Sequence, residues 1–145
     1  GNHLTLAVPL VPGSDPGASE VRSPAARTLE LEHNGLLTGE SAPAPFVRGV
    51  LLREDPRLYD GVIAGFPAGQ AWVELRDPSG LAVRIEQKAD AGGENFRFVF
   101  YSDGGKTFFC PEPWCGEPDS LNTGRGLLRL APGERFGWEL TLTIS

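Results

Sequence analysis

The feature that most constrains the fold is an alternation of apolar and polar residues that recurs along the chain. In residues 135–144 every second side chain is large and apolar: Phe136, Trp138, Leu140, Leu142 and Ile144. Residues at i, i+2 and i+4 of a β-strand lie on one face, so this pattern predicts a strand with one buried face. No window shows the sustained i, i+3, i+4, i+7 repeat of an amphipathic helix. The pattern predicts an all-β chain.

Turn residues separate the predicted strands. Residues 70–76 and 81–87 both alternate, and Asp77-Pro78-Ser79-Gly80 between them has the residues that a type I turn favours, which predicts an antiparallel hairpin. Residues 11–26 and 41–49 are rich in Pro, Gly, Ser or Ala and are predicted to be loops. The predicted fold class is therefore an all-β antiparallel β-sandwich. Further strands are predicted at 4–10, 27–32, 96–101, 107–110, 126–130 and 135–144.

Length and composition limit the remaining possibilities. A chain of 145 residues predicts one domain, 1–145, and 40% hydrophobic with 22% charged residues is typical of a globular protein. The net charge of −6 and the lack of a basic run argue against nucleic acid or an anionic membrane as a partner. No stretch approaches the roughly 20 apolar residues of a membrane span, and no signal-like segment is recognisable. We therefore expect a cytoplasmic protein that does not contact membranes.

The cysteines and histidines give no metal-binding pattern. Cys110 and Cys115 lie close together in the sequence, and we expect free thiols rather than a disulfide across so small a loop. His3 and His33 lie far from them, so no zinc-ligand spacing is present, and we expect no metal. His33 precedes Asn34-Gly35 and is interpreted as an exposed turn residue.

One acidic residue has an unusual setting. Glu112 stands between Pro111 and Pro113, and proline fixes its own φ and biases the preceding residue toward extended geometry. The carboxylate is thus held in one direction by a stiff, non-helical segment, predicted here as a loop. The plain alternative is a solvated carboxylate that pairs with Arg125, or a stiff connector of a purely structural domain.

The same region resembles a known family. FCPEPWCGEPDSLN followed by GLLRLAPGERF resembles the C-terminal signature of the aldose 1-epimerases, the galactose mutarotase-like group. GNHLTL at 1–6 is similar to the family's Asn-His segment, LLTGE at 36–40 to its Pro-Thr-Gly-Glu turn, and RLYDGVIAGF at 57–66 to its sugar-binding aspartate segment. After His3, however, Leu4 and Thr5 replace the aromatic residues typical of the family.

The resemblance implies a fold, an activity and a site. The fold would be the later part of a supersandwich, completed by an upstream segment or chain that these 145 residues do not include. The activity would be interconversion of the α and β anomers of a free aldose, with a monosaccharide substrate and no cofactor. Glu112 would be the general base, His3 the general acid and Asp60 a sugar ligand, and Trp114 could stack on the sugar.

Each assignment has an alternative that the sequence leaves open. His3 could be an exposed residue near a chain start, Asp60 a turn residue before Gly61, and Trp114 part of the core. At the level of function, the rivals are a carbohydrate-binding sandwich without turnover and a glycoside hydrolase. The hydrolase would pair Glu112 with Glu117 or Asp119 at the carboxylate spacing that such enzymes require.

Overall fold

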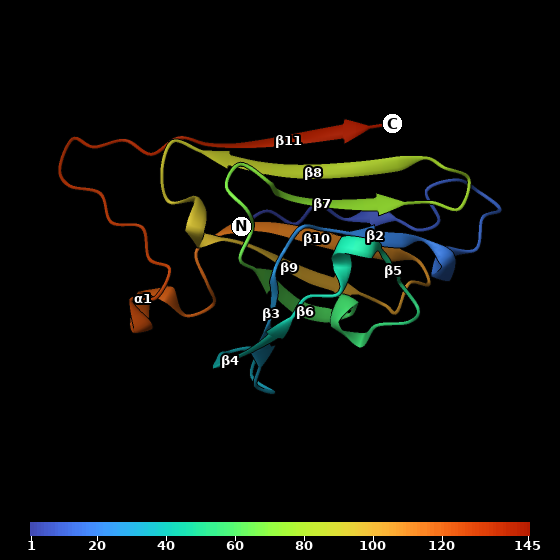
Figure 1. Ribbon diagram of the computed structural model, residues 1–145, viewed down its shortest axis with the longest axis horizontal. Coiled ribbons are helices and arrows are strands. Elements are labelled where there is room, and N and C mark those ends of the chain that lie inside the picture. The colour runs from blue at the N-terminus through green and yellow to red at the C-terminus, as the bar shows by residue number, and fades with distance from the viewer.

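The computed structural model describes residues 1–145 and shows two antiparallel β-sheets stacked face to face (Figure 1). The six-stranded sheet has the order β1-β10-β9-β6-β3-β4, and the five-stranded sheet has the order β11-β8-β7-β2-β5. The strands are β1 (Leu6–Ala7), β2 (Glu20–Arg22), β3 (Arg27–Leu31), β4 (Leu37–Pro43), β5 (Val50–Leu51), β6 (Asp60–Ala64), β7 (Ala71–Arg76), β8 (Ala82–Ala89), β9 (Phe96–Ser102), β10 (Phe108–Cys115) and β11 (Trp138–Ile144). The predicted fold class, an antiparallel β-sandwich, is confirmed.

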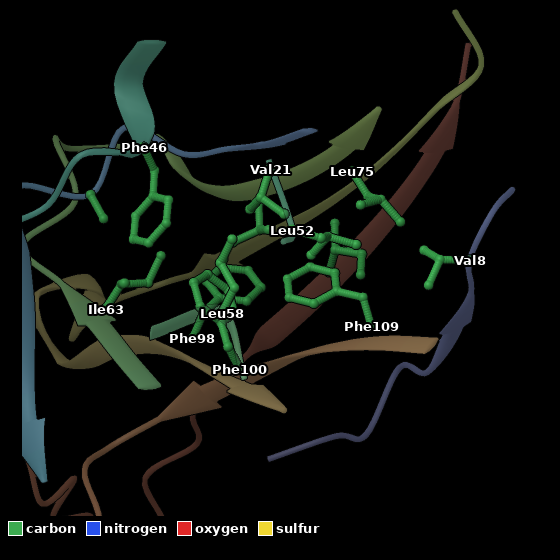
Figure 2. Packing of buried hydrophobic residues seen from close by; sticks show 13 residues of the cluster. Val8, Val21, Phe46, Leu52, Leu58, Ile63, Leu75, Phe98, Phe100 and Phe109 are labelled. Atoms are coloured by element: carbon green, nitrogen blue, oxygen red, sulfur yellow. The ribbon is translucent and has the colours of Figure 1, made fainter. Parts of the chain in front are cut away.

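The core lies between the two sheets and is rich in phenylalanine (Figure 2). Phe98 and Phe100 on β9 and Phe109 on β10 are fully buried. The alternation in residues 96–101 predicted that Phe98 and Phe100 lie on one face of a strand. Phe46 comes from a 3-10 turn at Phe46–Arg48 and meets Phe100 edge-on, with ring centroids 5.6 Å apart. Aromatic side chains of this size dominate the apolar area that a small sandwich removes from water.

Helices are short and peripheral. The one α-helix, α1, spans Ser120–Thr123, and four 3-10 turns lie at Pro16–Ala18, Phe46–Arg48, Pro56–Leu58 and Gly93–Asn95. None of these helices has the length and apolar character that crossing a lipid bilayer requires.

Several predicted elements are confirmed by the pairing of the strands. β7 and β8 form the predicted hairpin, with Arg76 opposite Ala82 and the turn at 77–80 between them. β9 covers the predicted strand at 96–101, and β3 matches the one predicted at 27–32. Asn34-Gly35 lies in a turn in which Gly35 has a φ of +79°, a conformation that glycine adopts at low cost.

Other predicted boundaries are wrong, and tertiary pairing explains each difference. The strand predicted at 4–10 is reduced to Leu6–Ala7, because only these residues pair with β10. Residues 126–130 form no strand, and β11 begins at Trp138 rather than at 135. Residues 41–43, predicted as loop, are the end of β4 and pair with β3, with Pro43 opposite Arg27. The segment 36–40, compared above with a family turn, likewise lies mostly in β4.

Candidate functional site

Glu112 lies in the middle of β10, not in a loop as the sequence predicted. It is opposite Val99 of β9, and its neighbours Pro111 and Pro113 are opposite Phe100 and Phe98. The backbone N–H and C=O of a strand residue point to the same side, and the carbonyl of Pro113 accepts a hydrogen bond from the Asn2 N–H at 3.2 Å. The prolines therefore turn their missing donors toward the sparsely paired edge of β10, where a strand tolerates proline.

The carboxylate of Glu112 is buried and has three polar neighbours. Only 4% of the residue is exposed. Nδ1 of His3 lies 2.9 Å from Oε1, and the indole Nε1–H of Trp114 donates to Oε2 at 3.2 Å. The thiol of Cys110 lies 3.8 Å from Oε1. One carboxylate oxygen therefore lies against an imidazole nitrogen and the other accepts from an indole, and the alternative pairing with Arg125 does not occur.

His3 reaches Glu112 from the N-terminal segment that runs along β10. Its side chain is 72% exposed, whereas that of Glu112 is 5% exposed. The two side chains that the resemblance selected are thus neighbours, although they lie far apart in the sequence. A base and an acid that act on the same sugar need the sugar between them, whereas here the imidazole and the carboxylate are in direct contact.

The register of the six-stranded sheet shows which other side chains lie on the same face of the sheet as Glu112. Residues directly opposite each other in antiparallel strands project to the same side. Glu112 is in line with Val99 of β9, Val62 of β6 and Leu29 of β3. Two residues along, Cys110 is in line with Tyr101 and Asp60. All of these side chains lie on the face of the sheet that turns away from the phenylalanine core.

Asp60 opens β6 and is exposed, two strands away from Glu112. With a strand spacing of about 4.8 Å and a rise of about 3.4 Å per residue, the two Cα atoms are about 12 Å apart. Asp60 also lines a cavity of about 380 Å³ with Leu29, Leu31 and Arg57. The guanidinium of Arg57 is held by Asp55, at 2.6 Å between Nη2 and Oδ2. Asp60 is therefore on the face of Glu112 but is not in contact with it.

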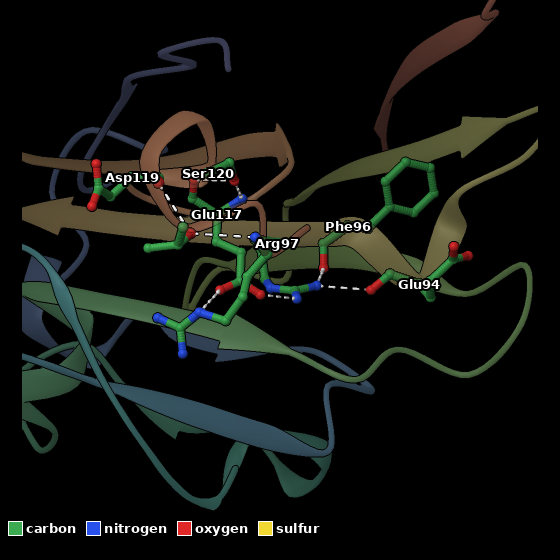
Figure 3. Close-up of polar contacts among 8 residues, drawn as sticks. Glu94, Phe96, Arg97, Glu117, Asp119 and Ser120 are labelled. Atoms are coloured by element: carbon green, nitrogen blue, oxygen red, sulfur yellow. Dashed lines mark hydrogen bonds and ion pairs between the residues drawn. The ribbon is translucent and has the colours of Figure 1, made fainter. Parts of the chain in front are cut away.

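Glu117, the second carboxylate of the hydrolase alternative, is engaged by arginine (Figure 3). Nη2 of Arg97 lies 2.8 Å from its Oε1, and Nε of Arg125 lies 3.9 Å from Oε2. Arg97 also donates to the backbone carbonyls of Glu94 and Phe96, both at 2.8 Å. Asp119 lies in the turn before α1, in the left-handed region with a φ of +63°. These contacts hold the α1 loop on β9 and are not the arrangement of a catalytic acid.

The structure adds two residues that the sequence reasoning did not select for the site. Tyr101 is 57% exposed on the face of Glu112 and packs against Phe108, with ring centroids 5.5 Å apart. Cys110 is buried beside Glu112, and this burial raises the pKa of its thiol. Both cysteines are free, and Cys115, five residues further along β10, projects to the opposite face. The signal for Tyr101 was present in the sequence, because it alternates out of phase with Phe98 and Phe100.

Comparisons with known proteins agree in fold. No protein-family model and no curated protein matches the sequence. Among solved structures, a galactose mutarotase-like protein from Clostridium acetobutylicum superposes over 99% of this chain with a TM-score of 0.76 at 21% identity. A candidate aldose 1-epimerase from Escherichia coli K12 superposes over 99% of it with a TM-score of 0.66 at 20% identity.

Coverage of these two proteins is partial. The chain spans 46% of the first and 48% of the second, less than half the length of each. The identities of 20–21% are evidence for fold rather than for shared chemistry. The superposition agrees with the fold that the sequence resemblance implied. This chain therefore has the fold of the galactose mutarotase-like proteins over about half of their length.

Proposed function

We propose that this chain carries the acid–base pair of an aldose 1-epimerase, which interconverts the α and β anomers of a free aldose. The observation that supports the proposal is the contact between Glu112 and His3, 2.9 Å from Oε1 to Nδ1, on a face whose floor is apolar. Glu112 was singled out by its flanking prolines and by the sequence resemblance, and His3 by the resemblance; the two lie far apart in the sequence and are neighbours in the fold. A carboxylate and an imidazole are the side chains most suited to proton transfer near neutral pH.

The chemistry needs one group that takes a proton and one that gives it. Glu112 removes the proton from the hydroxyl at the anomeric carbon, while protonated His3 donates to the ring oxygen. The bond between the anomeric carbon and the ring oxygen breaks, and a free aldehyde forms. Rotation about the bond next to the aldehyde presents its other face, and the two proton transfers run in reverse to close the ring. Each group contributes about 10²- to 10⁴-fold to the rate.

The exposure of the two groups suits these roles. Trp114 donates to Oε2 of Glu112 and fixes the carboxylate, which leaves Oε1 to meet the substrate. The side chain of His3 is largely exposed, so its imidazole can swing outward and admit a sugar between itself and Oε1. In this proposal the sugar replaces the direct contact between the two groups.

The remaining contacts of the sugar are proposed to come from the same face of the sheet. Val99, Val62 and Leu29 supply an apolar floor, and Asp60 accepts hydrogen bonds from sugar hydroxyls. Tyr101, between Cys110 and Asp60 in the register, offers an exposed ring on which a sugar face can rest. Other contacts would come from a complementary segment, because the chain spans less than half of the two similar structures.

A sugar-binding sandwich without turnover is the second candidate. It is favoured by the direct contact of His3 with Glu112. An acid and a base that pair with each other cannot exchange protons with a sugar unless the sugar separates them. The two candidates predict the same affinity for a monosaccharide and differ in the rate of anomer exchange.

The test uses the longest natural protein that contains these residues. The decay of optical rotation of a freshly dissolved anomer is measured with the native protein, with Glu112→Gln and with Glu54→Gln, an exposed glutamate outside the site. Glu112→Gln is expected to lower kcat by about 10²- to 10⁴-fold with little change in sugar affinity. Glu54→Gln should retain full activity.

Two outcomes would contradict the proposal, one at the level of the activity and one at the level of the residue. If the native protein binds the sugar but leaves the spontaneous rate unchanged, the chain is a binding module. If Glu112→Gln keeps the native rate, the base is another residue and the proposed site is wrong.

A further inference from the structure

Three metal-ligating atoms converge beside β10. A ring nitrogen of His3, Sγ of Cys110 and a carboxylate oxygen of Glu112 all lie within 4.8 Å of one another. Oε1 of Glu112 is closest to both partners, 2.9 Å from Nδ1 and 3.8 Å from Sγ. Cys110 and Glu112 project to the same face because they are two residues apart in one strand.

We propose that His3, Cys110 and Glu112 form a binding site for a divalent cation of the zinc class. A thiolate, an imidazole and a carboxylate make a mixed sulfur, nitrogen and oxygen donor set, which suits Zn²⁺ and Co²⁺ and not Mg²⁺ or Ca²⁺, which prefer all-oxygen sites. Three protein ligands with one open position are also the ligand number of zinc sites that bind water or substrate.

The distances between the donors are near those of a tetrahedral ion. For Zn–S of about 2.3 Å and Zn–N and Zn–O of about 2.1 Å, tetrahedral ligand atoms are about 3.4 to 3.6 Å apart. Oε1 of Glu112 is 2.9 Å from Nδ1 and 3.8 Å from Sγ, on either side of these values, and the His3 and Cys110 donors lie within 4.8 Å of each other. An ion that enters on the exposed side of His3 would therefore take most of the movement from the imidazole and little from the two buried ligands.

The surroundings hold two of the three ligands in place. The hydroxyl of Thr5 donates to Sγ of Cys110 at 3.3 Å, and Nε1–H of Trp114 donates to Oε2 of Glu112 at 3.2 Å. Such outer partners orient metal ligands and tune their basicity. Because Trp114 occupies Oε2, the oxygen that remains for the ion is Oε1, the one that faces His3 and Cys110. On binding, the thiol proton of Cys110 leaves to solvent and the sulfur–metal bond replaces it.

Occupation of this site has a consequence that rests on the proposed function. The ion would use Oε1 of Glu112 and Nδ1 of His3, the two atoms that are proposed to move protons. Zn²⁺ would then be a reversible inhibitor of anomer exchange. The binding itself does not depend on any turnover, so the two inferences fail separately.

The test is a titration of the protein with Co²⁺ under reducing conditions, followed by absorption. A cobalt–thiolate bond gives a charge-transfer band in the near ultraviolet, and we expect one equivalent of Co²⁺ to produce it and Zn²⁺ to remove it. Cys110→Ser should abolish the band, and Cys115→Ser, at a cysteine on the opposite face, should keep it.

The exposed histidines give a second pair of variants that does not disturb the core. His3→Ala should weaken Co²⁺ by more than the roughly 10- to 100-fold that loss of an outer partner costs, whereas His33→Ala should leave binding unchanged. A native protein without the band, a band that survives Cys110→Ser, or equal effects of the two histidine variants would overturn the proposal.

Discussion

Among single residues, Asp77 shows how a position can have a larger role than its sequence context suggests. It was predicted as the first residue of a turn, and Ser79 N–H does donate to its Oδ1 at 2.8 Å. The same carboxylate also accepts from Leu10 N–H at 3.0 Å, from Val11 N–H at 3.3 Å and from the Ser14 hydroxyl at 2.7 Å. Asp77 therefore ties the N-terminal segment to the β7–β8 hairpin.

These hydrogen bonds make Asp77 a source of pH-dependent stability. Burial by itself raises the pKa of this carboxyl, but the donors from Ser79, Ser14 and Val11 outweigh it and hold the pKa well below the ordinary value. A carboxyl whose pKa is lower in the folded state stabilises the fold above its unfolded pKa of about 3.9 and loses that contribution as the pH falls.

We therefore expect Asp77→Asn to lower the thermal midpoint at pH 7. Between about pH 4 and pH 2 the midpoint of this variant should fall less than that of the native chain. The measurement is thermal unfolding across this pH range. Asp90→Asn is the matched control, because the exposed Asp90 accepts only one hydrogen bond, from Gly137 N–H at 3.2 Å. An acid dependence that is the same in Asp77→Asn and the native chain would contradict this role.

Among elements, β6 is positioned by its contact with the 3-10 turn at Pro56–Leu58. A Cβ on Gly61 would lie 2.2 Å from the carbonyl oxygen of Arg57, a backbone atom that has no freedom to move alone. Only glycine allows β6 to lie so close to this turn. Because Asp60 directly precedes Gly61, the close approach also fixes the position of the Asp60 carboxylate on the face of the sheet that carries Glu112.

We expect Gly61→Ala to destabilise the fold by about 1–3 kcal/mol, because the new methyl group forces the turn away from β6. Chemical denaturation measures the free energy of unfolding. Gly93→Ala is the control, since a Cβ there would meet only Phe96, at 3.6 Å, and Gly93 has no positive φ. Equal stability of Gly61→Ala and the native chain would show that the turn yields easily.

At the scale of the whole molecule, β11 extends the five-stranded sheet beyond the cover of the other sheet (Figure 1). Leu142 and Ile144 are opposite the buried Ile85 and Val83, so they project to the core-facing side. They are nevertheless 50% and 65% exposed. Because the chain spans under half of the similar structures, we propose that a complementary β segment covers this row.

Leu142→Lys is expected to weaken association with that segment, or to destabilise a longer protein that includes it, by about 2–5 kcal/mol. Thr143→Lys, one residue along on the outward face, should have little effect. Intact-mass and N-terminal analysis of the natural protein identifies the segment, and thermal unfolding of both variants gives the comparison. If the natural species is this chain alone, a stable monomer that tolerates Leu142→Lys, the proposal is wrong.

The sequence by itself determined the fold class and the identity of the candidate pair. Alternation with a period of two is a local property, and the hairpin at 77–80 depends on turn residues that are adjacent in the chain, so both could be predicted from short windows. Glu112, His3 and Asp60 came from short motifs that resemble a family. The out-of-phase position of Tyr101 could be seen in the sequence, but no motif marked Tyr101 or Cys110 as part of the site.

Only the tertiary structure decided how these pieces meet. The strand predicted at 107–110 continues to Cys115 because it pairs with β9. The contact between His3 and Glu112 depends on the path of the N-terminal segment along β10. The same pairing places Cys110 beside Glu112 and leaves β11 uncovered. Strand register is set by contacts between distant residues, and a sequence window contains only near neighbours.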